Sequence, residues 1–237
     1  DLNSRRLDVL ILGNSESTDE IVLGLLASER CSITMLASQT SQIHPVVVDC
    51  ANESKIHLVY GEIGDTSVSG QIDLAHADAL IVSNFDRDEP DNSDLKILRT
   101  LLGIHDRSKQ NVGPHVIAEL NASDSRDMMA DLFDLDFVVS DKIGSKVFAQ
   151  YIENPHLIKV IDALICSNQH RITIRDMHVS GAAEVTFRNI QSMIVDSKGV
   201  LIGIRYKASE VYQTILNPGP DYVVRAAEAE LQGIFVE

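Results

Sequence analysis

Cysteine and proline are scarce in this chain of 237 residues, and each shortage excludes a class of protein. Cys31, Cys50 and Cys166 are an odd number, lie far apart and form no C-x-x-C pair, which argues against a disulfide framework and a thiolate metal site. Only 6 prolines and 13 glycines accompany 44% hydrophobic residues, so the chain is neither disordered nor collagen-like. We expect a folded protein with a sizeable core in a reducing compartment.

Positive charge is also in short supply. Lys and Arg number 20 against 35 Asp and Glu, which gives a net charge of −15, and no local basic patch interrupts this balance. Such a chain repels phosphate backbones and anionic lipid heads. We therefore expect no nucleic-acid partner.

Long apolar runs are absent. No run approaches the roughly 18 residues of a membrane-spanning helix, and the apolar stretch near the start is too short for a signal peptide. We expect no direct membrane insertion by this segment. The chain begins at Asp1 rather than Met, which allows a longer protein with a membranous part outside these residues.

What the first 140 residues do contain is short apolar runs that alternate with helical patterns. The predicted strands are 8–12, 32–36, 56–60, 79–83, 115–120 and 136–140. The helical patterns lie near 18–29, 43–53, 66–75, 92–105 and 123–133, the fourth with Leu95, Leu98, Leu101 and Leu102 on one stripe. Strands so rich in Val and Ile are buried on both faces. The alternation predicts an α/β fold, a Rossmann-like doubly wound parallel sheet.

The pattern changes after Ser140. Asp141 is a plausible N-cap of a helix that ends at Asn154-Pro155, and a second, apolar helix follows over 156–165, so 141–166 is predicted to be a helix-turn-helix hairpin. The aliphatic residues of the second helix cannot all face one core. This favours burial against a partner, and packing between two domains of the same chain is the alternative.

The residues from 167 to 237 form a separate pattern of short β-rich segments. These segments are 172–177, 200–206, 214–224 and 231–237, with a helix near 186–195 among them. The pattern predicts a small α+β lobe.

Ligands of doubly wound sheets bind at the carboxyl ends of the strands. The turn after the first strand, Gly13-Asn14-Ser15-Glu16-Ser17, lacks the second and third glycines of a dinucleotide fingerprint. Glu16 places a negative charge where a phosphate would lie, and residues 37–39 include no acidic residue to hold an adenosine ribose. Tight binding of NAD is therefore not expected, whereas a small polar ligand or a crevice without a ligand remain alternatives.

The candidate ligand-binding residues of this crevice come from four strand ends. They are Gly13, Asn14, Ser15, Glu16, Ser38, Ser83 and Glu119. Glu119 ends an apolar run, so its carboxylate points into the crevice or finds a buried partner. The turn also lacks the last glycine of a nucleophile elbow, and we assign no catalytic residue.

An acidic cluster follows the fourth strand. Its candidate metal ligands are Asp86, Asp88, Glu89, Asp91 and Asp94. Hard cations need several oxygen ligands close together, and Ca²⁺ is the candidate ion. The loop is not an EF-hand, because Pro90 and Ile97 stand at two ligand positions. The alternative is a solvated face whose carboxylates cap the next helix.

Several of these segments together resemble one family. They are DVLILGNSES, HADALIVSNFDRDEPDNSDLKILRTLL, HVIAEL, DFVVSDKIGSKVFAQYIENPHLIKVIDALI and LNPGPDYVV. From about residue 7 to 237 the chain resembles the RCK (regulator of K⁺ conductance) domains. It is most similar to the cytosolic RCK segments of the CASTOR and POLLUX ion-channel family.

The resemblance implies a non-enzymatic gating-ring module on the cytosolic side of a tetrameric cation channel, of potassium type, that responds to an ion or small ligand through oligomer rearrangement. The Rossmann-like lobe 1–140 would pair in a ring, the hairpin 141–166 would make a second dimer contact, and the lobe 167–237 would complete the subunit. The pore domain would lie outside this segment.

The rival hypothesis is a stand-alone Rossmann-type nucleotide-binding protein or oxidoreductase. Such an enzyme needs an acid, base or nucleophile in the crevice, where the sequence offers only Ser15, Glu16 and Glu119.

Overall fold

The structure is a computed structural model of the chain. It describes residues 6–14, 17–38, 43–61, 72, 74, 76–83, 90–108, 114–133, 135–166, 172–177, 184–194, 199–208, 211–224 and 231–236. The chain forms two compact units, Asp1–Ala149 and Gln150–Glu237. The division falls within one continuous helix, α6 (Ser140–Glu153).

Unit 1 is built on a parallel sheet of six strands in the order β3-β2-β1-β4-β5-β6. The strands are β1 (Leu7–Leu12), β2 (Cys31–Ala37), β3 (His57–Tyr60), β4 (Ala79–Val82), β5 (His115–Leu120) and β6 (Asp136–Val139). The order in which strands are added reverses at β1, which pairs with β2 on one side and with β4 on the other. This order is that of the doubly wound fold, so the Rossmann-like prediction is confirmed.

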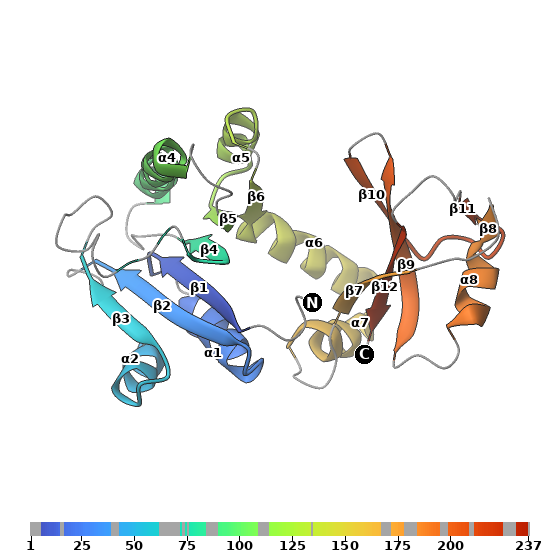
Figure 1. Ribbon diagram of the computed structural model, residues 1–237, viewed down its shortest axis with the longest axis horizontal. Coiled ribbons are helices and arrows are strands. Elements are labelled where there is room, and N and C mark those ends of the chain that lie inside the picture. Colours follow the sequence, from blue (N-terminus) through green and yellow to red (C-terminus); the bar gives the residue numbers. More distant parts are fainter. Residues whose placement is uncertain are drawn as a thin grey trace. The chain divides into compact units, whose positions relative to one another are not determined.

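Helices cover both faces of this sheet (Figure 1). Helices α1 (Thr18–Ala27) and α2 (Pro45–Asn52) pack with Val9, Ile11 and Met35 on one face. Helices α4 (Pro90–Ser108) and α5 (Ser123–Ala130) pack with Leu10, Leu12 and other residues on the opposite face. Because successive residues of a strand point to opposite faces, the continuous apolar runs supply both cores.

The α4 stripe was only partly right. Ile97, Leu101 and Ile104 are buried, whereas Leu95 and Leu102 are 59% and 48% exposed. Residues 97, 101 and 104 recur at helical spacing, and Leu95 and Leu102, seven residues apart, share another side. Two leucines of the predicted stripe therefore lie on the surface.

A helix pair follows β6. Helix α6 is followed by α7 (Leu157–Ile161) and a π-helical turn, Asp162–Cys166. The predicted N-cap was one residue late, since α6 begins at Ser140 and Asp141 lies in its first turn. No side chain of α6 or α7 is buried.

Unit 2 contains an antiparallel sheet in the order β10-β9-β12-β7 and a two-stranded sheet, β11-β8. Its elements are β7 (Ile172–Asp176), β8 (Val185–Thr186), α8 (Phe187–Met193), β9 (Val200–Ala208), β10 (Val211–Leu216), β11 (Val223–Val224) and β12 (Leu231–Val236). Thr186 caps α8 by accepting a hydrogen bond from the Asn189 N–H. Phe187 and Ile190 of α8 share a core with Ile204 and Phe235. The small α+β lobe is confirmed.

The segment 214–224 is two elements rather than one. Strand β10 ends at Leu216, Asn217 adopts φ of 45°, and Pro218 cannot donate to a strand ladder. The chain then turns and β11 joins β8 in a different sheet. The predicted helix 66–75 lies outside the described residues, apart from Ile72 and Leu74.

Within the described part of the chain, no helix combines the length and the apolar character needed to cross a membrane.

Alanine substitutions at two glycines are expected to change the free energy of unfolding in opposite directions. A Cβ at Gly203 would lie 2.7 Å from the Ile215 carbonyl oxygen, whereas a Cβ at Gly144 in α6 meets nothing within 4 Å. We expect Gly203→Ala to lower the free energy of unfolding by about 1–3 kcal/mol. Gly144→Ala should raise it by up to about 1 kcal/mol. Urea denaturation measures both, and an unchanged midpoint for Gly203→Ala would contradict the close approach of β9 and β10.

Candidate functional site

The candidate site lies at the carboxyl ends of the central strands of unit 1. Gly13, directly after β1, has φ of 103°, a value that favours glycine, and its N–H donates to the Leu36 carbonyl at 3.0 Å. Asn14 and Thr18 are buried beside it. The turn is thus bound to β2 by its backbone and leads directly into α1.

Glu119 of β5 is the centre of the polar contacts here. Its Oε1 accepts hydrogen bonds from the Ser140 hydroxyl at 2.9 Å and from the Ser17 hydroxyl at 3.4 Å. Its Oε2 accepts one from the Ser83 hydroxyl at 3.2 Å. The three serines precede α1, follow β4 and begin α6. One carboxylate therefore joins four segments that are far apart in the sequence.

The chemistry of this arrangement differs from that of a phosphate site. A carboxylate brings negative charge to the crevice, and the hydroxyl groups that could donate to a phosphate already donate to Glu119. The serines fill three of the roughly four acceptor positions of the carboxylate, so Glu119 can accept about one further hydrogen bond from a ligand. The prediction that NAD does not bind tightly rests on this geometry as well as on the missing glycines, and it stays a prediction.

The predicted crevice residues can now be located. Ser83 and Glu119 are in contact, Gly13 and Asn14 form the turn, and Ser38 follows β2 at the same edge of the sheet. Ser15 and Glu16 lie outside the described residues. The hydroxyls of Ser17 and Ser140 were not predicted as part of the site. Both residues follow the carboxyl end of a strand, and this position is the signal that could have indicated them.

Asp94 has a defined structural contact. This side chain is 6% exposed, and its two oxygens accept hydrogen bonds from the Asn121 N–H at 3.0 Å, the Asn121 side-chain amide at 3.3 Å and the Ala122 N–H at 3.1 Å. It thereby holds the loop between β5 and α5 against α4. Asp94 fixes the chain two residues beyond Glu119.

The other predicted metal ligands are not placed. Asp86, Asp88 and Glu89 lie outside the described residues, and Asp91 is in the first turn of α4 with its side chain undescribed. In the part of the chain that the structure describes, no three His, Cys, Asp or Glu side chains are grouped to hold a metal ion. The metal site stays a prediction.

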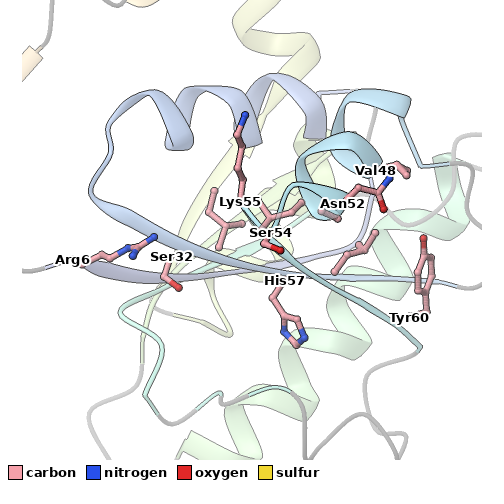
Figure 2. A pocket seen from close by; sticks show the side chains of 12 residues that line it. Arg6, Ser32, Val48, Asn52, Ser54, Lys55, His57 and Tyr60 are labelled. Atoms are coloured by element: carbon pink, nitrogen blue, oxygen red, sulfur yellow. The ribbon is translucent and has the colours of Figure 1, made fainter.

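A hollow of about 550 Å³ lies along the edge strand β3 and helix α2 (Figure 2). Arg6, Lys55 and His57 line it, together with nine other residues. The Arg6 guanidinium donates to the Cys31 carbonyl, and Lys55 pairs with Glu53 at 2.6 Å. The hydrogen bond and the charge of Glu53 raise the pKa of Lys55. The lining includes neither Glu119 nor its serine partners, so the hollow is separate from the candidate site.

A solved structure is similar to this chain over almost its whole length. The human SLO3 gating ring matches this chain with a TM-score of 0.70 over 97% of its length, at 14% sequence identity. The chain has the fold of that gating ring. It spans 44% of the gating-ring chain, less than half of its length. The resemblance to RCK domains is thus confirmed at the level of the fold.

Two further structures match less well. The GsuK channel bound to NAD matches with a TM-score of 0.47 and 15% identity, over 97% of this chain and 36% of its own. The NAD(P)-binding domain of an exopolyphosphatase-related protein from Archaeoglobus fulgidus has a TM-score of 0.46 and 16% identity, over 62% of this chain and 98% of its own. No protein-family model and no curated protein matches the chain.

The role of Asp94 can be tested by stability. Asp94→Ala would remove the buried carboxylate that accepts from Asn121 and Ala122, so we expect a loss of about 1–3 kcal/mol in the free energy of unfolding. Asp127→Ala, at an exposed position of α5, is the matched control and should stay within about 0.5 kcal/mol of wild type. Equal stabilities of the two variants would show that Asp94 does not hold the loop.

Proposed function

We propose that this chain is a regulatory gating-ring module of a tetrameric cation channel of potassium type, on the cytosolic side of the membrane. The observation that supports this most is the match to a gating ring over 97% of the chain. The family motifs quoted above favour the CASTOR and POLLUX channels as the nearest relatives. In this proposal the pore domain lies outside these residues and the chain is not an enzyme.

Assembly through the α6–α7 helix pair is the first part of the proposal. Phe148, Ile152 and Ile158 are 69%, 83% and 51% exposed, and α6 and α7 bury no side chain. Covering apolar surface stabilises an assembly by about 25 cal/mol per Å². A second copy of this chain is the partner that the proposal assigns to this helix pair.

A second apolar surface supports a ring rather than an isolated pair. Leu95 and Leu102 of α4 and Met128 and Leu132 of the α5 region are each at least 48% exposed. Two distinct contact surfaces let each subunit touch two different neighbours, and such contacts can close into a ring. The α4 and α5 residues are the proposed side-by-side contact of the Rossmann-like lobes.

Ca²⁺ is the proposed ligand, with Asp86, Asp88, Glu89, Asp91 and Asp94 as its candidate ligands. Five carboxylates within nine residues repel one another, and a divalent cation relieves that repulsion. The ion can bias the pore only by the difference between its affinities for two ring conformations. The contacts of Asp94 with Asn121 and Ala122 make the remaining four the stronger candidates.

The rival function, a nucleotide-binding protein or oxidoreductase, has less support. Its base would be Glu119, whose two oxygens already accept hydrogen bonds from three serines. These hydrogen bonds stabilise the ionised carboxylate and so weaken it as a base.

The assembly is tested by molar mass in solution. We expect the wild-type chain to be at least dimeric at tens of micromolar, an order of magnitude that suits a weak interface. Ile152→Asp combined with Ile158→Asp should shift it towards monomer, because two buried carboxylates would be left unpaired at the contact. The control is Leu23→Asp, at a 41% exposed leucine of α1 outside the proposed contact surfaces, which should keep the wild-type mass. Light scattering that finds a strictly monomeric wild type would overturn the assembly.

The ligand is tested by titration. We expect millimolar Ca²⁺, the range of weak sites, to raise the melting temperature of wild type but not of the Asp86→Asn plus Asp91→Asn variant. NAD and NADP should produce no heat of binding at micromolar concentrations. An equal shift in both proteins would make the acidic cluster a solvated face, and micromolar NAD affinity would revive the rival function.

A further inference from the structure

The start of helix α6 is bound to Glu119 of strand β5 by a side-chain hydrogen bond. Ser140 is the first residue of α6, and its hydroxyl donates to Oε1 of Glu119 at 2.9 Å, the shortest of the three serine contacts. Glu119 is in the neighbouring strand β5, which pairs with β6 directly before the helix. The same helix continues from unit 1 into unit 2.

Packing does little to fix this helix. Every residue from Ser140 to Glu153 is exposed or only partly buried, whereas α1, α2 and α5 each bury side chains. The first turn of a helix has backbone N–H groups without intrahelical partners and a partial positive charge, and a carboxylate beside it is stabilising. The contact with Glu119 is therefore a large part of what holds the amino end of α6.

Oε1 of Glu119 is shared between two elements. It accepts hydrogen bonds from both Ser140 and Ser17, and the Ser17 contact is the longer at 3.4 Å. Ser17 is the N-cap residue of α1. One carboxylate oxygen can accept both bonds at once, but a cation or donor that binds Glu119 and draws its carboxylate away from α6 lengthens the bond to Ser140.

We propose that Glu119 is the positioning residue of α6, and that a change in the crevice reaches this helix through the hydrogen bond from Ser140 to Oε1. The proposal deepens the proposed function and rests on it for its biological meaning, since a regulatory module needs a path from a site to a moving element. The hydrogen bond itself, however, belongs to a single subunit.

Hydrogen exchange of the complete chain tests the proposal. In Ser140→Ala, exchange of the hydrogen-bonded amides near the start of α6, residues 144–147, should be faster by on the order of tenfold, because opening no longer breaks a hydrogen bond to a charged group. Ser140→Thr keeps the hydroxyl and should restore slow exchange. Glu119→Asp, which retracts the carboxylate by one methylene, should resemble Ser140→Ala.

The matched control is Ser28→Ala. It removes a serine hydroxyl that donates to the Leu25 carbonyl at the end of α1, does not involve Glu119, and should leave exchange in α6 unchanged. Unchanged exchange in Ser140→Ala, or equal acceleration in Ser28→Ala, would overturn the proposal, because the effect on α6 would then come only from general stability.

The measurement is repeated in the Ile152→Asp, Ile158→Asp background. A monomeric wild type would contradict the proposed assembly but would not affect this comparison. If the effect of Ser140→Ala is lost in this background, the coupling acts between subunits, and the proposal of a coupling within one subunit is overturned.

Discussion

The carboxylate of Glu119 is the contact on which the crevice depends. Parallel strands end at one edge of the sheet, and each turn at that edge leaves polar groups that need partners. Glu119 accepts from hydroxyls of Ser17, Ser83 and Ser140, and Asp94 fixes the two residues of the loop just beyond β5. Two acidic side chains thus hold together segments that the backbone alone would leave separate.

The sheet was predictable because its signal is local. Runs such as DVLIL and HVIAEL can be buried on both faces only in a parallel sheet between helices, and these strands formed within a residue or so of the expected positions. Which leucines of α4 are buried was harder to predict from the sequence. Leu95, Leu98, Leu101 and Leu102 are chemically alike, and only the placement of α4 on the sheet decides that Leu101 is buried and Leu102 exposed.

The place of Glu119 at the edge of the sheet was predictable, but its contacts were not. A carboxylate at the end of an apolar strand indicates a polar partner, and the doubly wound order says at which edge to look. That the partner would be the hydroxyl of Ser140 depends on where α6 begins, which local sequence does not determine to one residue. A different limit affected β10 and β11: the sequence Asn-Pro-Gly-Pro at 217–220 marks a turn within the segment, but it does not tell that the second strand joins another sheet.

The length of helix α6 has a mechanical consequence. Its 14 residues extend over about 21 Å at 1.5 Å per residue. A tilt of about 10° at Ser140 would therefore displace the far end of the helix by roughly 4 Å. In the proposed assembly the exposed side chains of Phe148 and Ile152 lie towards that end, so a small change beside Glu119 would alter the fit between two subunits.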